Sequence, residues 1–560
     1  MKLALAQINP TVGDFSGNAE KILQFADRAA EQGADLVVFP ELAVCGYPPA
    51  DLLEKQAFVQ RAGEVVDQIA AWTSEAGRPG LLCGTVTPAE SAEGKHVRNV
   101  AVLLDGGRVL FTQQKRLLPF YDVFDEQRYF EPGADQALTE FRGQRLAITV
   151  CEDAWNDKGF WRERRYGVDP VEDLLRVWDG REGEQRIILN ISASPYWKGK
   201  RGVREEMLGA LAKRHGAVVA MTNQVGGNDS LIFDGSSLVV GIDGGVVTRG
   251  RSFDEDLVMF DTAWKGDGAV PQARNADERD EIAATWDALV LGTRDYVRKC
   301  GFAKALVGLS GGIDSAVVAA IAVEALGAGN VMGVGMPSEY SSTGSVDDAR
   351  TLAASLGVRF EVLAIHDVFL GYMKALDPMF AGTPFGLAEE NIQARIRGAL
   401  LMALSNKFGA LVLTTGNKSE MSTGYCTLYG DMVGGLAVIG DVWKTRVYEL
   451  SEYANRERDV IPRSTIEKAP SAELRPEQKD TDSLPPYDVL DPMLEAYVED
   501  YRSAEEIAGE QRVDVEQVRA VLKLVERSEY KRQQAAPVLK VTKKAFGMGR
   551  RFPIAVKVQV

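Results

Sequence analysis

The segment Leu309-Ser310-Gly311-Gly312-Ile313-Asp314-Ser315 lies between an apolar run, residues 304–309, and a helix-forming run, residues 316–326. This order predicts a strand, a tight glycine-rich turn and the N-terminus of a helix. Such a turn lets backbone N–H groups face an anion without a Cβ atom in the way, and the helix N-terminus adds partial positive charge. Ser310 and Ser315 add hydroxyl donors. The segment therefore predicts a phosphate-binding loop.

Asp314 is the unusual member of this segment. Its carboxylate repels phosphate unless a divalent cation lies between them, so the sequence predicts a bound Mg²⁺. The segment lacks the lysine and the spacing of the G-x-x-x-x-G-K-[ST] loop. It instead resembles the S-G-G-x-D-S loop of the ATP pyrophosphatases, which adenylate a carbonyl or carboxyl oxygen and release pyrophosphate. The other interpretation, a plain strand-to-helix turn, explains the two glycines alone.

Beyond this loop the chain alternates strands and helices. The expected strands are 304–309, 331–336, 359–364 and 410–413, and the expected helices are 281–300, 316–326, 345–356 and 390–408. This alternation predicts a Rossmann-like parallel sheet with right-handed crossovers and with ligands at the carboxyl ends of its strands. Thr415 and Glu420 follow the last strand, where a hydroxyl and a carboxylate suit phosphate or ribose contact and a second metal ligand. Helix capping is the other interpretation of Thr415.

The first half of the chain has many short strand-like runs and few helices. The expected strands are 2–7, 35–39, 81–86, 97–104, 108–113, 146–150, 187–191, 218–222 and 237–242, with a helix at 18–31. Asp105-Gly106-Gly107 supplies a hairpin turn between two of them. Strands this frequent predict a layered α/β sandwich for this half, so the fold class of the whole chain is α/β.

Three reactive side chains stand at ends of these strands: Glu41, Lys115 and Cys151. A thiol nucleophile needs a base for its proton and a cation for the oxyanion of its tetrahedral intermediate, and a glutamate and a lysine can fill these roles. The chain has only three histidines, none in a catalytic motif, which disfavours a Cys-His enzyme. Taken singly, the cysteine can be core packing, the glutamate a cap and the lysine a surface charge.

Taken together, these residues and their neighbours resemble the nitrilase superfamily. The matching segments are Phe39-Pro40-Glu41-Leu42, Lys115-Arg116-Leu117-Leu118-Pro119 and Val150-Cys151-Glu152-Asp153. The resemblance implies an α-β-β-α sandwich in which Glu41 is the general base, Lys115 the oxyanion partner and Cys151 the nucleophile that forms an acyl enzyme. It also implies that glutamine is held by Tyr121, Ser192 and Lys198.

The second half resembles NAD⁺ synthetases, and the chain as a whole resembles the family of glutamine-dependent NAD⁺ synthetases. Besides the phosphate loop, the matching segments include residues 389–398, 414–420, 440–445, 468–474 and 482–488. The resemblance implies that ATP is bound by Gly308, Leu309, Ser310, Gly311, Gly312, Ile313, Asp314, Ser315, Thr415, Lys444 and Ser471. It implies that deamido-NAD⁺ is bound by Asn391, Glu420 and Lys531. Glu420 is alternatively a second ligand, with Asp314, of Mg²⁺.

Length and composition limit the remaining possibilities. At 560 residues the chain is too long for one core. The polar, Gly- and Pro-containing stretch 265–280 predicts a linker between an amidase domain, 1–264, and a synthetase domain, 281–560. A net charge of −16 argues against a general nucleic-acid binder, and no apolar run approaches the roughly 20 residues that cross a bilayer. Five scattered cysteines and the lack of a signal-peptide pattern lead us to expect a cytoplasmic protein.

The tail from residue 527 is basic, opposite to the chain as a whole. A nucleic-acid arm is one interpretation. The resemblance offers a simpler one, since a dinucleotide and a polyphosphate need positive charge, and it also implies a homo-oligomer. The reaction that the resemblance implies is hydrolysis of glutamine and transfer of its ammonia to adenylated deamido-NAD⁺, which gives NAD⁺. Two alternatives are a different glutamine amidotransferase that uses the same loop, and an ammonia-only synthetase whose first half is a scaffold.

Overall fold

The first half of the chain folds into two sheets and the helices that cover them. The computed structural model describes residues 1–90, 93–179, 185–263 and 280–557. Its strands here are β1 Lys2–Gln7, β2 Leu36–Val38, β3 Gly80–Pro88, β4 Val97–Asp105, β5 Arg108–Gln114, β6 Thr139–Phe141, β7 Gln144–Val150, β8 Arg186–Ser192, β9 Ala217–Asn223, β10 Val225–Asn228, β11 Leu231–Asp234, β12 Leu238–Val240, β13 Val246–Arg249 and β14 Asp256–Asp261. The helices are α1 Phe15–Glu31, α2 Gln56–Trp72, α3 Glu126–Tyr129, α4 Pro170–Arg176 and α5 Lys200–His215.

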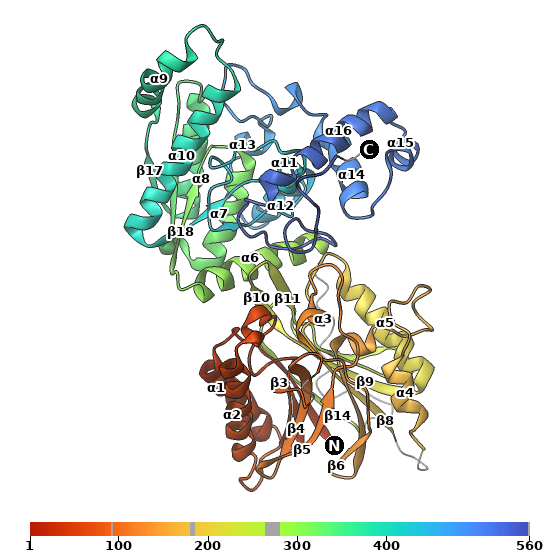
Figure 1. Ribbon diagram of the computed structural model, residues 1–560. Helices are drawn as coiled ribbons and strands as arrows, with labels where there is room; N and C mark the ends of the chain where they lie inside the picture. Colours follow the sequence, from red (N-terminus) through yellow and green to blue (C-terminus); the bar gives the residue numbers. More distant parts are fainter. Residues whose placement is uncertain (91–92, 180–184, 264–279, 558–560) are drawn as a thin grey trace. The chain divides into compact units, whose positions relative to one another are not determined.

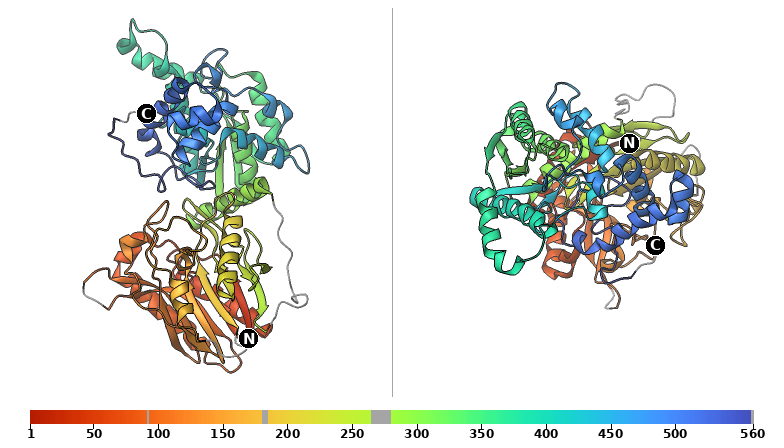
Figure 2. Two further views of the ribbon diagram at one scale, coloured as in Figure 1. Left: turned by 90° about the vertical axis from the view of Figure 1, so that its right-hand side faces the viewer. Right: turned by 90° about the horizontal axis from the view of Figure 1, so that it is seen from above.

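The two large sheets have six strands each, in the orders β14-β1-β2-β3-β4-β5 and β13-β12-β9-β8-β7-β6. Leu5 and Leu103 of one sheet pack with Leu189 and Val218 of the other in a buried apolar layer. Helices α1 and α2 cover the outer face of the first sheet, and α4 and α5 cover the outer face of the second (Figure 1). Figure 2 shows the two layers of strands from another side. The predicted α-β-β-α sandwich is confirmed.

Helix α1 begins earlier than the predicted residue 18. The Asp14 carboxylate accepts a hydrogen bond of 3.0 Å from the Gly17 N–H, so the helix is capped at Asp14 and begins at Phe15. Its buried face contains Ile22 and Phe25, as the periodicity predicts. Local capping chemistry therefore adds a turn that the apolar pattern alone does not indicate.

The second half is built on one sheet. Its strands are β15 Lys304–Gly308, β16 Val331–Gly335, β17 Arg359–Val362, β18 Ala410–Thr414 and β19 Leu436–Ala437. Its helices are α6 Glu281–Lys299, α7 Ile313–Leu326, α8 Thr343–Leu356, α9 His366–Phe380, α10 Leu387–Phe408, α11 Lys418–Thr423, α12 Lys444–Ala454, α13 Arg463–Glu467, α14 Tyr487–Val498, α15 Ala504–Gln511, α16 Val515–Arg527 and α17 Glu529–Arg532.

This sheet has five strands in the order β17-β16-β15-β18-β19, and every neighbouring pair is parallel, as predicted. The phosphate-loop segment joins β15 to α7, at the centre of the sheet. Leu306 and Val412 of the sheet pack against Leu401 of α10. A second apolar cluster holds helices α14 to α16 together around Leu494 and Leu522. The fold thus places the carboxyl ends of β15, β16 and β18 side by side.

The chain divides into two compact units, Met1–Asn228 with Ile232–Glu278, and Asp229–Leu231 with Arg279–Val560. We call them the first and the second unit. The linker predicted at 265–280 lies outside the described residues except for Asp280, so its bounds stay a prediction. None of the helices that the structure describes combines the length and the apolar character needed to cross a membrane.

Candidate active sites

Strand ends in the first unit bring Glu41 and Lys115 together. Glu41 follows β2 and Lys115 follows β5, and both side chains are completely buried. The Lys115 ammonium donates a 2.7 Å hydrogen bond to Oε1 of Glu41. The backbone N–H of Ala193, just past β8, donates to Oε2 of the same carboxylate at 3.1 Å. A buried carboxylate with this many donors is held in one orientation.

Three further residues around this pair were not predicted from the sequence: Glu126, Asn99 and Tyr47. Glu126, in α3, accepts a 2.8 Å hydrogen bond from the Lys115 ammonium, and the Asn99 side-chain amide donates to Glu41 at 2.7 Å. Tyr47 donates its hydroxyl to Glu126 at 2.8 Å. Glu126 does not follow a strand, because it lies in a short helix within a loop. The sequence indicates it only as a carboxylate 11 residues after Lys115.

The charges around Lys115 set its protonation state. Burial alone would lower the pKa of Lys115, but the carboxylates of Glu126 and Glu41 outweigh burial and hold that pKa well above its usual value. Burial, opposed by the charge of Lys115, raises the pKa of Glu126. Lys115 is therefore a permanent cation that two carboxylates share.

Cys151 lies at the end of β7, in the first residue of a 3₁₀ turn, Cys151–Ala154. Its φ of +43° is in the left-handed region, which non-glycine residues seldom adopt, and its side chain is buried. Burial, and then the negative charge of Glu41, raise the pKa of the Cys151 thiol well above its usual value, while Lys115 lowers it. The thiol is therefore protonated at neutral pH, and a nucleophilic role would require a base to take its proton.

Hydrogen bonds connect two of the predicted glutamine-binding residues, Tyr121 and Ser192, to this turn. The Tyr121 hydroxyl donates to both oxygens of Glu152 at 3.0 Å, and Tyr166 donates to one of them at 3.0 Å. Ser192 donates to Asn190 at 2.6 Å, and the amide of Asn190 donates to the Cys151 carbonyl at 3.3 Å. Lys198 is half-buried in the segment between β8 and α5. These substrate roles stay predictions.

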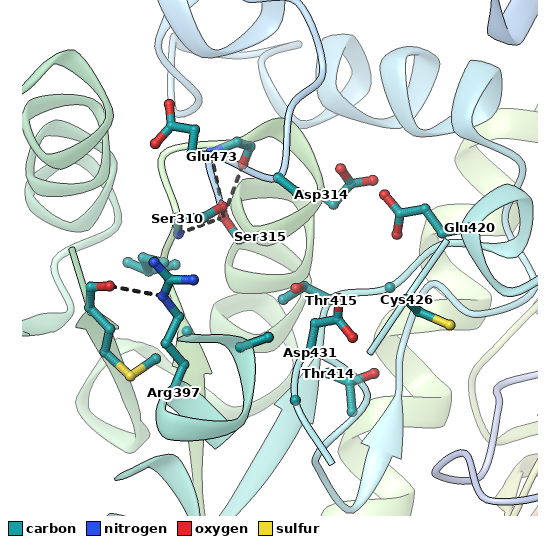
Figure 3. Close-up of a pocket in the computed structure, with 18 of the residues that line it drawn as sticks. Ser310, Asp314, Ser315, Arg397, Thr414, Thr415, Glu420, Cys426, Asp431 and Glu473 are labelled. Atoms are coloured by element: carbon teal, nitrogen blue, oxygen red, sulfur yellow. Dashed lines mark hydrogen bonds between the residues drawn. The ribbon is translucent and has the colours of Figure 1, made fainter. Parts of the chain in front are cut away.

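A cavity of about 290 Å³ lies at the carboxyl ends of the strands in the second unit. Most of the predicted ATP residues line it: Gly308, Leu309, Ser310, Gly312, Ile313, Asp314, Ser315, Thr415, Lys444 and Ser471. Figure 3 shows this cavity, with Ser310 and Ser315 from the loop on one side and Thr414 and Thr415 from β18 and its end below them. The structure thus gathers residues that are more than 150 positions apart in sequence around one space.

The loop itself has the conformation that its glycines allow. Gly311 has φ +78°, and a Cβ atom there would come within 2.3 Å of the Ser345 carbonyl oxygen. The Ser310 hydroxyl accepts a 3.2 Å hydrogen bond from the Gly312 N–H, and Ser315 donates to the Gly312 carbonyl at 2.9 Å. Helix α7 begins at Ile313, so its N-terminus faces the cavity as predicted.

Asp314 and Glu420 point toward the same part of the cavity (Figure 3). Asn417 joins them, because its side-chain amide donates to Asp314 at 2.9 Å and its backbone N–H donates to Glu420 at 3.1 Å. Lys444 forms an ion pair with Asp314. Burial, and then the negative charge of Asp314, raise the pKa of Glu420 well above its usual value. A cation that enters here would relieve this repulsion.

The donor set fits Mg²⁺, which proteins bind through one or two carboxylates together with substrate phosphates. No group of three or more His, Cys, Asp or Glu side chains within the described ranges is arranged to hold a metal ion. A metal ion that binds together with a nucleotide needs fewer protein ligands, because the phosphates supply the others, and Asp314 and Glu420 offer two carboxylates.

Asn391 and Lys531, predicted to bind the dinucleotide, do not line the cavity but hold one of its walls. The Lys531 ammonium donates to the carbonyls of Gly424 and Cys426 at 2.7 Å each, and Asn391 accepts from the Thr427 hydroxyl at 2.7 Å. Cys426 lines the cavity. These hydrogen bonds support segment 424–427. Contact of Asn391 and Lys531 with deamido-NAD⁺ stays a prediction.

Several basic residues of the tail also have partners within the chain. Arg550 donates to Glu529 at 2.8 Å and to Glu526 at 3.2 Å. Arg532 donates to Glu529 at 2.8 Å and to the Ser422 carbonyl at 2.8 Å. These guanidinium groups fasten the tail to α11 and α16, so part of the tail's positive charge is structural.

Five charged residues that line the cavity were not predicted as site residues: Arg397, Asp431, Lys468, Glu473 and Asp480. Arg397 of α10 donates from Nε to the Met336 carbonyl at 3.0 Å, and Asp431 accepts from the Thr427 N–H at 2.7 Å. Burial lowers the pKa of Arg397 to about 10. Glu473 accepts from Lys468 at 2.7 Å and from Ser345 at 2.7 Å. Arg397 stands in the segment 389–398 that the sequence singled out, but no spacing rule marks it.

Comparisons with known proteins agree with this division into two sites. Residues 2–263 match the carbon-nitrogen hydrolase family, and residues 285–535 match the NAD synthase family. The glutamine-dependent NAD(+) synthetase of Synechocystis sp. is 49% identical over 560 residues, covering 99% of this chain and 98% of that protein. That of Thermotoga maritima is 42% identical over 587 residues, with the same coverage.

A solved structure is also similar over the full length. It is the glutamine-dependent NAD⁺ synthetase from Acinetobacter baumannii in complex with ADP, 40% identical, with a TM-score of 0.75 and coverage of 99% of this chain and 98% of that one. A second structure, from Cytophaga hutchinsonii, has a TM-score of 0.82 at 21% identity and shares the fold. The chain belongs to the family of glutamine-dependent NAD⁺ synthetases.

Proposed function

We propose that this protein makes NAD⁺ from deamido-NAD⁺, with ATP as co-substrate and glutamine as the source of the amide nitrogen. The observation that carries this proposal is that one chain gathers residues suited to amide hydrolysis in its first unit and residues suited to nucleotide binding in its second. The first unit holds a buried Lys115–Glu41 pair, with Cys151 at the end of β7, and in the second unit the phosphate loop, which includes Asp314, lines a cavity together with Glu420. Family membership over the full length supports the same reaction.

In the first unit, Glu41 takes the proton of the Cys151 thiol as Sγ attacks the side-chain amide carbon of glutamine. The tetrahedral intermediate carries a negative oxygen, which the ammonium of Lys115 stabilises. Ammonia leaves with the proton that Glu41 returns. Glu41 then activates a water molecule that hydrolyses the thioester, and glutamate departs. Tyr121, Ser192 and Lys198 hold the substrate in this proposal.

In the second unit, an oxygen of the nicotinate carboxylate attacks the α-phosphate of ATP and pyrophosphate leaves. The N–H groups of the loop 308–315, with Thr415, Ser471 and Lys444, receive the phosphates, and Lys444 offsets the charge of the leaving group. Mg²⁺, held by Asp314 and Glu420, would neutralise further phosphate charge when bound. Ammonia then attacks the carbonyl carbon, and AMP leaves.

The experiment that tests this function compares nitrogen sources. NAD⁺ formation from deamido-NAD⁺, ATP and Mg²⁺ is measured with glutamine and, separately, with ammonium. The proteins are the native chain, Cys151→Ala, and Cys83→Ala as a control, because Cys83 is also a buried thiol but lies in the apolar core. We expect Cys151→Ala to lose only the glutamine-driven reaction and Cys83→Ala to keep both.

Other outcomes would overturn parts of the proposal. If the native chain uses ammonium but not glutamine, the first unit is a scaffold. If neither nitrogen source yields NAD⁺, the substrate is wrong and another acceptor of the same chemistry, a different carboxylate or carbonyl adenylated by ATP, is used. If Cys83→Ala also loses activity with both nitrogen sources, replacement of a buried thiol by alanine destabilises the protein. The loss of activity in Cys151→Ala then has the same cause.

A cytoplasmic location and a homo-oligomer are the remaining parts of the proposal. The five cysteines are all free, as a reducing compartment favours. Large apolar side chains are exposed on α9 and at the start of α10: Leu370 is 50% exposed, Met379 80% and Leu387 71%. An apolar surface of this kind is typical of a subunit contact. Light scattering of the purified protein gives its mass in solution, and a monomeric mass would refute the oligomer.

A further inference from the structure

Asp153 lies two residues after the nucleophile and connects two segments of the first active site. Its Oδ1 accepts hydrogen bonds from the backbone N–H groups of Arg116, at 3.1 Å, and Leu117, at 2.9 Å. Its Oδ2 accepts a third from the N–H of Val150, at 3.1 Å. The first two donors directly follow Lys115 in the chain, and the third directly precedes Cys151. One carboxylate therefore fastens the lysine segment to the nucleophile turn.

Among the described residues, no pairing between strands joins these two segments. Strands β5 and β7 belong to different sheets of the sandwich. The Arg116 and Leu117 N–H groups lie past the end of β5, beyond the last paired residue of that strand. Because Asp153 is only 1% exposed, water cannot replace it as the acceptor for these donors.

The Cys151 turn also needs a restraint. Cys151 has φ +43°, an unfavourable conformation for a residue with a side chain, and persists only where surrounding contacts fix it. The bond from the Val150 N–H to Asp153 closes the turn over Cys151. A residue that fixes both the strained nucleophile turn and the segment after Lys115 controls the distance between thiol and ammonium.

We infer that Asp153 is a positioning residue for amide hydrolysis: it sets the placement of Cys151 against Lys115 and does not itself touch the substrate. This inference rests on the proposed role of Cys151 as the nucleophile. Displacement of a reacting group by about 1 Å can lower a rate by about 100-fold. Removal of the Asp153 carboxylate should accordingly slow the attack of the thiol and leave substrate affinity nearly unchanged.

The chain offers a matched control in Asp157. Its side chain is buried to a similar degree, 2% exposed, and it too accepts from two backbone N–H groups, those of Gly159 at 2.7 Å and Phe160 at 2.9 Å. These donors belong to its own loop, and Asp157 also forms an ion pair with Arg214 at 3.2 Å, so none of these partners belongs to a catalytic segment. Asp157→Asn therefore reports the consequence of removing a buried, hydrogen-bonded carboxylate from this region.

The experiment uses the full-length native protein, Asp153→Asn and Asp157→Asn. We expect Asp153→Asn to lower the kcat of glutamine-driven NAD⁺ synthesis by about 10- to 100-fold, with little change in the KM for glutamine. The ammonium-driven reaction should be unchanged, because it does not use the first site. The rate at which iodoacetamide alkylates Cys151, followed by mass spectrometry of the peptide, should fall in parallel. Asp157→Asn should match the native protein in all four quantities.

Each other outcome has a defined meaning. Equal losses of kcat in the two variants, following their losses of thermal stability, would overturn the inference and leave Asp153 a structural residue. An unchanged kcat and alkylation rate in Asp153→Asn would overturn it outright. If Asp153→Asn does not fold, Asp153→Ser keeps one acceptor oxygen and must show the same selective loss. A native chain that makes no NAD⁺ refutes the proposed function instead, and the alkylation rates then decide the role of Asp153.

Discussion

The ammonium nitrogen of Lys115 lies 2.7 Å from Oε1 of Glu41, and neither side chain has any exposed surface. Removal of one partner from such a pair leaves a buried charge alone, which costs about 3–5 kcal/mol of stability. Glu126 shares the same ammonium, so the site carries two carboxylates for one cation. In the proposed mechanism Glu41 accepts the thiol proton, and Glu126 keeps its hydrogen bond to Lys115.

Glu41→Gln tests whether Glu41, and not Glu126, is the base that accepts the Cys151 proton. The amide keeps the shape of the side chain but cannot take the Cys151 proton, so we expect the glutamine-driven rate to fall by about 10²- to 10⁴-fold. Ammonium-driven synthesis should be unaffected, and both rates are measured on one preparation. Retention of glutamine-driven activity would show that a different group is the base.

Glu126→Gln should have a smaller and different effect. In the native protein the Lys115 ammonium donates a 2.8 Å hydrogen bond to the Glu126 carboxylate. The variant keeps an acceptor for this hydrogen bond but removes the negative charge. We expect a loss in kcat of about 10- to 100-fold for the glutamine-driven reaction, less than for Glu41→Gln. Steady-state kinetics with both nitrogen sources measure it. A loss equal to that of Glu41→Gln would mean that Glu126 shares in the proton transfer.

Gly311→Ala should disable the second site and spare the first. A Cβ atom at Gly311 would lie 2.3 Å from a backbone oxygen of Ser345, at φ +78°, so the loop must move. We expect NAD⁺ formation to be lost with either nitrogen source, while glutamate release from glutamine persists. Gly329→Ala is the control, because no atom lies within 4 Å of a Cβ there. Normal synthesis by Gly311→Ala would refute the assignment of the loop to ATP.

Asn417→Ala should weaken the response to Mg²⁺. The Asn417 side chain donates to the Asp314 carboxylate, and its Oδ1 accepts from the backbone N–H of Glu420. Its loss therefore frees the Asp314 carboxylate and removes the cap of α11, the helix that carries Glu420. We expect the Mg²⁺ concentration for half-maximal ammonium-driven synthesis to rise by about tenfold. Asn455→Ala is the matched control, since Asn455 likewise bonds to backbone groups, those of Val460 and Ile461, away from the cavity. An equal shift in both variants would contradict the prediction.

The stability of the first unit should depend on pH through Asp153. Burial raises the pKa of Asp153 to about 6, against an unfolded value of about 3.9. A carboxyl group with a raised pKa binds its proton more tightly in the folded protein, so its stabilising contribution is complete below pH ~4 and is lost as pH rises through ~6.

We therefore expect the free energy of unfolding of the native protein, relative to Asp153→Asn, to decrease by about 2 kcal/mol between pH 4 and 6.5. Urea unfolding followed by tryptophan fluorescence measures it, because Trp155 and Trp161 lie close to Asp153 in the chain. A difference that stays constant over this range would show that the carboxyl titrates near its usual pKa.

The sequence by itself determined the elements and the local motifs. The strand, the glycines and the helix N-terminus around Leu309–Ser315 are consecutive, and so the phosphate loop could be predicted from hydrophobic pattern and glycine chemistry. The same holds for the positions of Glu41, Lys115 and Cys151, each at the end of a run typical of a strand. These features depend on interactions between near neighbours in the chain.

Only the tertiary structure decided which side chains meet and which charges are left for substrate. Glu126 reaches Lys115, Asp153 reaches the Leu117 N–H and Asn417 joins Asp314 to Glu420 because the sheets bring loop ends together. No sequence period encodes such contacts, since they join segments from different strands or different sheets. The tail shows the same principle: its basic residues are evident in the sequence, but burial against Glu526 and Glu529 commits two of its arginines to the fold.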